Sequence, residues 1–264
     1  MTIDILICTY NDGIKRIPNL ILPCNNTIFY KISHQITDKR FAIIPPELLR
    51  KDIQISQIYS KGLSNNRNNA LSMATSDICF VADDDVKYKL SYLENIKYYY
   101  EKNPNVDLYV GKIKTDGKDY KKYDVREKTI NWMNVASVSS IEITFRRNSI
   151  HNNSIVFDEN FGINGNWFSK GEEVIFLSDC LKKKLKIQYV PFFIVEHPYE
   201  NTGRGTIYNK EEAMYWGALF RRVFGFLSYA FSLPLAVKHY NRYNKHISVI
   251  SFLYSFYKGI TRFK

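Results

Sequence analysis

Short apolar runs alternate with segments of helical periodicity from the first residue to about residue 200. Runs rich in β-branched and aromatic residues predict strands, and apolar residues three or four positions apart predict helices. The strands expected on this basis are residues 3–9, 28–33, 53–59, 77–82, 106–114, 139–146 and 187–195. The expected helices are residues 14–22, 64–74 with Ser64 as the cap, 90–102 and 172–185. This alternation predicts right-handed βαβ units, and hence an α/β domain with a mostly parallel central sheet flanked by helices.

Two segments lack any periodicity and are expected to be loops. Residues 115–128 are charged and contain glycine, so an exposed loop is predicted there. Residues 157–170 are aromatic and rich in glycine and asparagine, a composition that suits a loop lining a cleft.

Three carboxylates follow the apolar run of residues 78–82 without a gap, namely Asp83, Asp84 and Asp85. Adjacent negative charges repel one another, so a divalent cation is the simplest reason for the cluster, because hard cations bind carboxylate oxygens. A buried strand that ends in carboxylates also places them where open α/β sheets bind ligands. The alternative is the start of a helix, where aspartate is favoured. Helix capping accounts well for one aspartate and poorly for three.

Composition and charge narrow the class of protein. The chain has 264 residues and 45% of them are hydrophobic, so it is expected to be globular, as one large domain with or without an appendage. Its net charge of +11 predicts an anionic partner, which leaves nucleic acid, a phosphorylated ligand or an anionic membrane. Most of the excess lies in residues 201–264, which hold ten Lys or Arg against two acids.

The cysteines and the first residues bear on the compartment. The four cysteines are scattered and form no CxxC pair, which predicts reduced, structural thiols in a cytosolic protein. Residues 1–9 have the pattern of a strand and not of a signal peptide.

Five short motifs stand in a particular order along residues 1–200. They are Thr9-Tyr10-Asn11, Gly62-Leu63-Ser64 with Arg67-Asn68 and then Ala74 and Asp77, the aspartate triplet at 83–85, the stretch FDENFG at 157–162, and Gly171-Glu172-Glu173. Together they resemble the family 2 glycosyltransferases of the GT-A fold. An acidic triplet alone is a weak signal, whereas the ordered set is specific.

The resemblance implies a GT-A catalytic domain over residues 1–204, and the composition of residues 205–264 predicts a basic, aromatic-rich, amphipathic helical tail as a C-terminal extension. The resemblance also implies positions for the donor and the metal. The donor-nucleotide contacts would be Thr9, Tyr10, Asn11, Arg67, Asp83 and Asp84, and Mn²⁺ or Mg²⁺ would be bound by Asp85, Asp83 and His197. Taken alone, Arg67 could instead be a solvated charge, Tyr10 a packing residue and His197 an ordinary surface or core histidine.

The acceptor hydroxyl needs a base, and a carboxylate at a helix start beside a cleft suits that role. The resemblance points to Glu173, with Glu172 beside it, although the family usually has aspartate as the second acid, so the two roles could be exchanged. Both could instead be first-turn acids that complement a helix dipole. Trp167 and Phe168 could stack on an acceptor sugar or simply pack.

The sequence indicates the identity of the donor nucleotide less clearly than it indicates the donor-binding positions. Many relatives have an acidic residue after the second strand that reads the base, but His34-Gln35 stands there in this chain, with Asp38 nearby. The donor is therefore expected to be a nucleotide-sugar, with a UDP-sugar favoured.

The composition of residues 205–264 predicts a membrane surface as a partner. Residues 223–237 are free of charge, but this stretch is shorter than the roughly 20 apolar residues that span a bilayer. Aromatic helices with Lys and Arg at their margins suit the membrane interface, so peripheral docking on the cytoplasmic face of the cell membrane is expected. The alternative is that residues 223–237 pack on the catalytic domain.

The sequence as a whole thus predicts an inverting, metal-dependent glycosyltransferase of the hexosyltransferase class. Its acceptor would be a hydroxyl of a glycan or lipid-linked glycan in bacterial surface polysaccharide synthesis. The alternatives are a sugar nucleotidyltransferase, or a non-catalytic basic protein that binds membrane or nucleic acid. A nucleotidyltransferase would need a glycine-rich basic loop after the first strand, which residues 10–13 do not provide. Bare carboxylates would repel the phosphates of a nucleic acid, so no nucleic-acid partner is expected.

Overall fold

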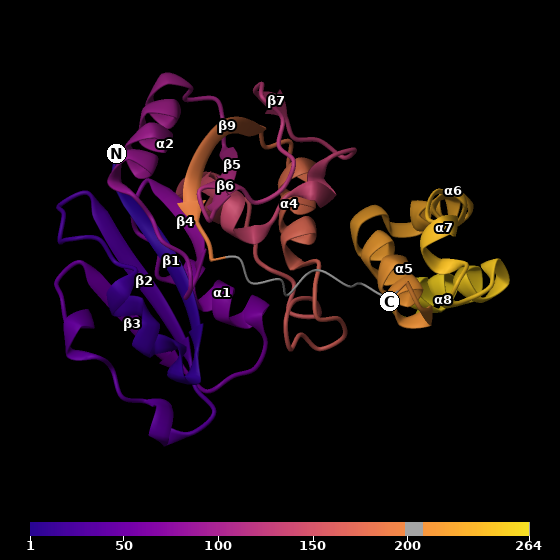
Figure 1. Cartoon of the computed structure of the whole chain (residues 1–264), viewed down its shortest axis with the longest axis horizontal. Coiled ribbons are helices and arrows are strands. Elements are labelled where there is room, and N and C mark those ends of the chain that lie inside the picture. Colours follow the sequence, from indigo (N-terminus) through magenta and orange to yellow (C-terminus); the bar gives the residue numbers. More distant parts are fainter. Residues whose placement is uncertain (199–207, 264) are drawn as a thin grey trace. The chain divides into compact units, whose positions relative to one another are not determined.

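The computed structural model describes residues 1–198 and 208–263. The chain forms two compact units, Met1–Tyr199 and Glu200–Lys264, which are described separately (Figure 1). The predicted domain boundary between residues 204 and 205 lies outside the described residues and stays a prediction.

The first unit is built on one nine-stranded sheet with the order β3-β2-β1-β4-β8-β5-β9-β7, and β6 pairs with β5. The strands are β1 (Ile3–Tyr10), β2 (Ile28–Gln35), β3 (Ile53–Ile58), β4 (Ile78–Asp83), β5 (Leu108–Thr115), β6 (Lys118–Asp119), β7 (Lys128–Thr129), β8 (Ile143–Arg146) and β9 (Ile187–Glu196). β1 to β4 pair in parallel, and β5 pairs in parallel with β9. The short β8 lies antiparallel between β4 and β5. The predicted α/β class, with a mostly parallel sheet flanked by helices, is confirmed.

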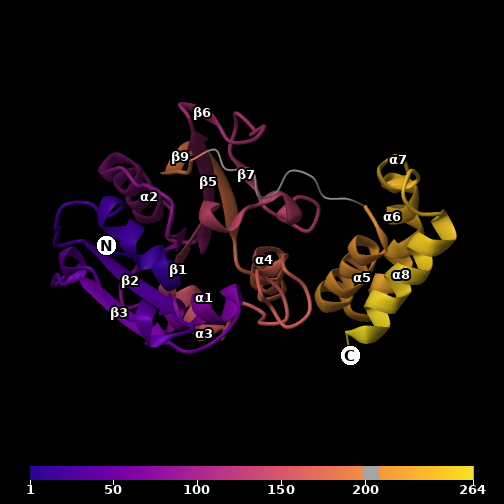
Figure 2. The same ribbon diagram turned by 60° about the horizontal axis from the view of Figure 1, so that its bottom comes forward.

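Helices cover both faces of this sheet, as Figures 1 and 2 show. They are α1 (Leu63–Ser72), α2 (Leu90–Lys102), α3 (Arg147–Asn152) and α4 (Glu172–Lys182). Leu93, Ile96 and Tyr100 of α2 belong to one buried cluster, whereas α1, α3 and α4 contribute to a second one. Short 3₁₀ turns lie at Asn11–Asn19, Lys39–Phe41, Pro46–Leu48, Val135–Ser137 and Ser140–Glu142.

Several sequence-based bounds were wrong, each for a local reason. Ser64 does not cap α1, because Gly62 occupies that position with φ +96° and the Ser64 hydroxyl instead donates to the carbonyl of Phe161 at 2.6 Å. The strand predicted at 139–146 begins only at Ile143, because Ser139 and Glu142 form a capping box around a 3₁₀ turn. The helix predicted at 14–22 is a 3₁₀ helix that contains Pro18.

Other elements were not expected from the pattern. The short helix α3 was missed, and the predicted loop 115–128 contains the two-residue strand β6 and leads into β7. None of the four cysteines forms a disulfide, and Cys24 is the exposed one.

The second unit consists of helices. They are α5 (Lys210–Phe224), the 3₁₀ helix η6 (Gly225–Phe231), α6 (Ser232–Lys238), α7 (Tyr240–Tyr243) and α8 (Val249–Arg262). α5 and α8 lie side by side (Figure 2) and touch through glycine, since a Cβ at Gly217 would come within 1.9 Å of the Phe256 carbonyl oxygen. Gly225, with φ +58°, ends α5 and divides the apolar stretch 223–237. Among the described residues, no helix combines the length and apolar character that crossing a membrane requires.

Candidate functional site

The candidate site lies where several strands end at one edge of the sheet. β1, β4, β5 and β9 run in the same direction, so their carboxyl ends share that edge. The register pairs Cys8 with Asp83, which places the start of the aspartate triplet beside the end of β1. This is the edge at which open α/β sheets bind ligands.

Arg67 of α1 holds two of the predicted site carboxylates together. Its Nη2 donates to Asp83 Oδ1 at 3.0 Å and its Nη1 donates to Glu172 Oε1 at 2.7 Å. Nη2 also donates to the Ser140 hydroxyl at 2.9 Å, and the guanidinium lies 5.5 Å from the centre of the Phe157 ring. Arg67 is only 3% exposed, so it is a buried bridge between the end of β4 and the start of α4, and not the solvated charge of the alternative interpretation.

Burial and charge act on this cluster in opposite ways. Burial opposes the charge of Arg67, but Asp83 and Glu172 outweigh it and raise the pKa of the guanidinium. Burial raises the pKa of Glu173 to about 8, and the negative charge of Glu172 adds to the rise. Glu172 Oε2 is buried without a hydrogen-bond partner. The two neighbouring glutamates therefore differ, because Glu172 is bound to Arg67, whereas the raised pKa of Glu173 favours its protonated form.

Asp84 points away from the other two aspartates. Its carboxylate accepts a hydrogen bond from the Thr9 hydroxyl and forms an ion pair with Arg16. The backbone of Gly13 lies so close that a Cβ there would come within 2.0 Å of Asp84 Oδ2. Asp84 thus ties the end of β1 and the first 3₁₀ helix to β4. Thr9 and Asp84 are hydrogen-bonded to each other. Their direct contact with a nucleotide stays a prediction.

Asp85 pairs with His197, which follows β9. His197 Nε2 lies 3.4 Å from Asp85 Oδ2, and this contact lowers the pKa of Asp85 and raises the pKa of His197. Asp85 Oδ1 and His197 Nδ1 are both buried without a hydrogen-bond partner. These unsatisfied atoms fit a pair that can accept a further ligand.

The predicted ligand set for a metal is only partly assembled. Over residues 1–198 and 208–263, no three His, Cys, Asp or Glu side chains gather in a way that could bind a metal ion. Asp83, the third predicted ligand, is directed to Arg67. The residues therefore fit a cation bound by Asp85 and His197 that takes its other ligands from elsewhere.

A pocket of about 430 Å³ adjoins Asp85 and His197. Its other walls are rich in lysine, and its full lining is Asp85, Lys87, Lys89, Lys114, Asp116, Gly117, Glu196, His197 and Pro198. Lys89 pairs with Glu196 at 2.8 Å, and Lys114 lies 3.9 Å from the same carboxylate. Sequence patterns did not single out these lysines, because they come from two segments far apart in the chain, the connection between β4 and α2 and the strand β5.

Tyr10 and Asn11 close the end of β1. The ring of Tyr10 is 48% exposed, so it is not the packing residue of the alternative interpretation. Asn11 has φ +48° and exchanges hydrogen bonds with Thr37, while its carbonyl contacts Nε2 of the buried His34 at 2.8 Å. Asp38, which lies near the position of the missing base-reading acid, pairs with Arg40. Tyr10 is thus available to a ligand, and Asn11 shapes the turn.

The loop at 157–170 docks on the start of α1. Leu63 N donates to the Ile163 carbonyl at 2.8 Å. The Ser64 hydroxyl, also in the first turn of α1, donates to the Phe161 carbonyl. Phe168 stacks on the buried Phe161 with their ring centres 5.6 Å apart. Trp167 is 39% exposed. Of the two predicted acceptor residues, Phe168 is thus engaged in packing, whereas Trp167 presents part of its surface to solvent.

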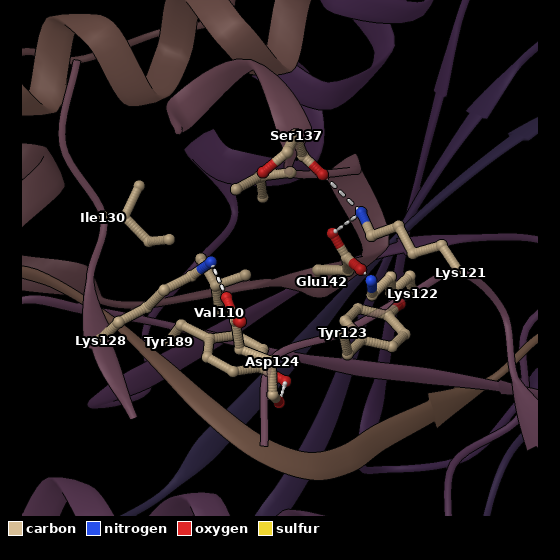
Figure 3. Close-up of a pocket in the computed structure, with 11 residues that line it drawn as sticks. Val110, Lys121, Lys122, Tyr123, Asp124, Lys128, Ile130, Ser137, Glu142 and Tyr189 are labelled. Carbon is tan, nitrogen blue, oxygen red and sulfur yellow. Dashed lines mark hydrogen bonds and ion pairs between the residues drawn. The ribbon is translucent and has the colours of Figure 1, made fainter. Parts of the chain in front are cut away.

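Sequence patterns missed the turn that carries Ser140, because a serine outside any motif has no signal of its own. Figure 3 shows how this turn is held. Glu142, 1% exposed, accepts from the Tyr123 hydroxyl at 2.5 Å and from Lys121 Nζ at 2.7 Å, and Lys121 also donates to the Ser137 carbonyl. These residues line a pocket of about 90 Å³. Because Lys121 and Glu142 pair with each other, they brace the turn beside Arg67.

Residues 47–169 match the family model described as glycosyl transferase family 2. This segment contains Arg67, the aspartate triplet and Trp167, whereas β1 and Glu173 lie outside it. No curated protein sequence matches the chain.

Solved structures match nearly the whole chain. S. aureus TarS 1–349 has a TM-score of 0.61 and 14% identity, over 98% of this chain and 81% of that one. The same TarS segment in complex with UDP gives 0.60 and 13% identity, over 91% and 72% of the two chains. Its complex with UDP-GlcNAc gives 0.60 and 14%, over 98% and 82%. The predicted GT-A fold and the predicted resemblance to family 2 are both confirmed.

Proposed function

We propose that this chain, whose residues 47–169 match glycosyl transferase family 2 and whose fold is that of GT-A enzymes, is a glycosyltransferase that uses a nucleotide-sugar donor. It would transfer the sugar to an acceptor hydroxyl with inversion at the anomeric carbon. The acceptor would be a glycan or lipid-linked glycan, as expected for bacterial surface polysaccharide synthesis.

One observation carries the proposal, namely the Arg67 bridge between Asp83 and Glu172. Asp83 begins the motif that the resemblance assigns to the donor, and Glu172 begins the helix that it assigns to the base. Arg67 contacts both at 3.0 Å and 2.7 Å, which supports the proposal that these residues belong to one site. A transfer between two bound molecules needs this proximity.

The geometry favours Glu173 over Glu172 as the base. Glu172 Oε1 accepts a hydrogen bond from the buried guanidinium of Arg67, so this oxygen is already engaged within the protein. Glu173 is half-buried and its pKa is raised, so it can take a proton at neutral pH. In the proposed step Glu173 accepts the acceptor's hydroxyl proton as the oxygen attacks the anomeric carbon. The bond to the nucleoside diphosphate breaks from the opposite face, and a single displacement of this kind inverts the configuration.

Asp85 and His197 would bind Mn²⁺ or Mg²⁺, with the remaining ligands supplied by the donor diphosphate. Such a cation would stabilise the negative charge that grows on the leaving diphosphate. Lys87 and Lys114, which line the same pocket, add positive charge that complements the diphosphate. The exposed ring of Tyr10 is suited to stacking on the base.

The donor is proposed to be a UDP-sugar. The support is that TarS, which shares the fold, has been solved in complex with UDP and with UDP-GlcNAc. Trp167, partly exposed, is proposed to contact the acceptor.

The test is a panel of nucleotide-sugars, each measured for Mn²⁺-dependent hydrolysis and for a shift in melting temperature. We expect one or a few UDP-sugars to be hydrolysed. Asp85→Ala should abolish the Mn²⁺-dependent hydrolysis. The matched control Asp12→Ala, at an exposed aspartate, should leave this hydrolysis unchanged. If no donor were hydrolysed and none shifted the melting temperature, the proposal would be contradicted.

A further inference from the structure

We infer that the outer face of η6, α6 and α8 is a docking surface for an anionic lipid bilayer. This face belongs wholly to the second unit and plays no part in the proposed transfer reaction. It is called the apolar face below, and its members are Phe226, Leu227, Tyr229, Leu233, Val237, Ile250, Tyr254 and Tyr257.

The apolar face is unusually exposed for side chains of this kind. Phe226 is 80% exposed, Val237 77% and Ile250 81%. Exposed apolar residues are ordinary when they are scattered singly, but a contiguous group points to a binding surface.

Contacts between the elements join the parts of the apolar face that come from η6, α6 and α8. The rings of Tyr229 in η6 and Tyr257 in α8 stack with their centres 6.0 Å apart. The Ser232 hydroxyl at the start of α6 lies 2.8 Å from the Tyr257 hydroxyl. Ile250, Tyr254 and Tyr257 are spaced four and three residues apart, so they form one stripe along α8 that borders η6 and α6.

α8 is apolar on two faces, although packing within the unit needs only one. Phe252, Phe256 and Ile260 are buried against the rest of the unit. A surface helix normally carries charged or polar residues opposite its buried stripe. On α8 the opposite side carries Ile250 and Tyr254, which are 81% and 71% exposed. The core of the second unit therefore does not account for this stripe.

The charge of the second unit favours an anionic partner. The described part of the second unit carries eight Lys or Arg, namely Lys210, Arg221, Arg222, Lys238, Arg242, Lys245, Lys258 and Arg262, against Glu211 and Glu212. Arg221 lies over the exposed Phe226 ring at 4.1 Å, so cationic and apolar groups occur together. Such a surface fits an apolar layer bordered by negative charge, which is the boundary of an anionic bilayer. A second copy of the chain would bring a like positive charge and would be repelled.

The geometry also sets how the unit would bind. α8 has 14 residues and α6 has seven, both too short to span about 30 Å of hydrocarbon. The helices would instead lie in the interface, with Phe226, Leu233 and Ile250 among the acyl chains. The tyrosines would sit at headgroup level, where their hydroxyls remain hydrated.

The test is flotation of the whole chain with liposomes of phosphatidylcholine alone or with added phosphatidylglycerol. We expect binding to the anionic vesicles, weaker binding at high salt, and little binding to the neutral ones. The triple variant Phe226→Ser, Ile250→Ser, Tyr254→Ser should lower the bound fraction at least tenfold. Because all three side chains are exposed, the variant should melt as the parent does.

A matched control removes exposed apolar groups from the first unit. Leu49→Ser with Met133→Ser, at positions 74% and 95% exposed, should leave flotation unchanged. Equal flotation of the parent and the triple variant would overturn the proposal, as would equal binding to neutral and anionic vesicles. So would a parent that is oligomeric and binds no vesicle, with the triple variant monomeric, since the apolar face would then join copies of this chain.

Discussion

The two units place their charged and apolar side chains in opposite ways. In the first unit, charged groups such as Asp4, Asp52, Arg67, Glu142 and Glu172 are buried and bonded to one another or to the backbone. In the second unit, the only buried charged residue among those described is Glu212. Ten of the 22 large, exposed hydrophobic residues lie in its 56 described positions.

This contrast separates two uses of a side chain. Buried charges are stable only when they are paired and hydrogen-bonded, so they fix the geometry of the groups around them. Exposed apolar groups contribute little to the geometry of the fold. They become stabilising only when a partner covers them and removes them from water. The proposed transfer reaction would therefore use the first unit, and the proposed bilayer docking would use the second.

The sharpest way to break this comparison is to remove the buried bridge. Arg67→Met should leave Asp83 and Glu172 without their cation, and kcat/KM should fall about 10³-fold. The free energy of unfolding should fall by about 3–5 kcal/mol, because a buried charge is left unpaired. Urea unfolding and initial rates measure the two effects.

The matched control is Arg40→Met, at an exposed ion pair with Asp38. Pairs of that kind contribute about 1 kcal/mol or less. If both variants had equal stability, the claim that buried charges organise the first unit would be wrong.

A second prediction separates the two glutamates. Glu173→Gln should lower kcat by about 10²–10⁴-fold without loss of stability, because it removes only a proton acceptor. Glu172→Gln should also destabilise the fold, because it leaves Arg67 with one carboxylate. Thermal melts and kcat values of both variants test this, and the reverse pattern would exchange the two roles.

The third prediction concerns pH. Glu173 must lose its proton to act as a base, and its pKa is raised to about 8. The value of kcat/KM should therefore rise about tenfold per pH unit below pH 8 and level off above it. A flat profile from pH 6 to 9 would remove Glu173 as the base.

Stability should follow the opposite trend. In the folded state Glu173 keeps its proton up to about pH 8. In the unfolded state, with the ordinary pKa of 4.5, it would lose that proton at a much lower pH. Between pH 4.5 and about 8, the contribution of Glu173 to the free energy of unfolding should thus decrease as pH rises. Glu173→Gln should remove this part of the pH dependence.

The smallest expected effect concerns the second unit. Gly217→Ala would place a Cβ 1.9 Å from the Phe256 carbonyl oxygen, so α5 and α8 must separate. We expect a loss of about 1–3 kcal/mol, measured by circular dichroism melts. Lys258→Ala, on exposed α8 surface, is the control and should melt as the parent does. Donor hydrolysis should persist in both variants, and its loss would mean that the second unit supports the chemistry.

Much of the fold could be predicted, because the signals for its elements are local. Apolar runs located the strands from β1 to β4, and the aspartate triplet marked the end of β4. The helix expected at residues 90–102 occurs as α2 with those bounds. Strand 139–146 was predicted too long, because a capping box between Ser139 and Glu142 resembles extended chain in composition.

The partners within the site could not be predicted in the same way. The motif suggested that Arg67 contacts the nucleotide, yet its bonds go to Asp83, Glu172 and Ser140. Such contacts join residues up to 105 positions apart, and no local pattern encodes them. The difference between Glu172 and Glu173 likewise depends on burial, which two adjacent identical residues cannot reveal.

The direction of β8 has a consequence for how this site could vary. Because β8 runs against β4 and β5, its beginning, and not its end, lies at the edge where the other strands finish. The chain therefore reaches the site before it enters the sheet, through the segment 130–142. Insertions or deletions there could reshape one wall of the site while every strand keeps its register. In proteins built this way, functional residues are to be sought before an antiparallel strand as well as after a parallel one.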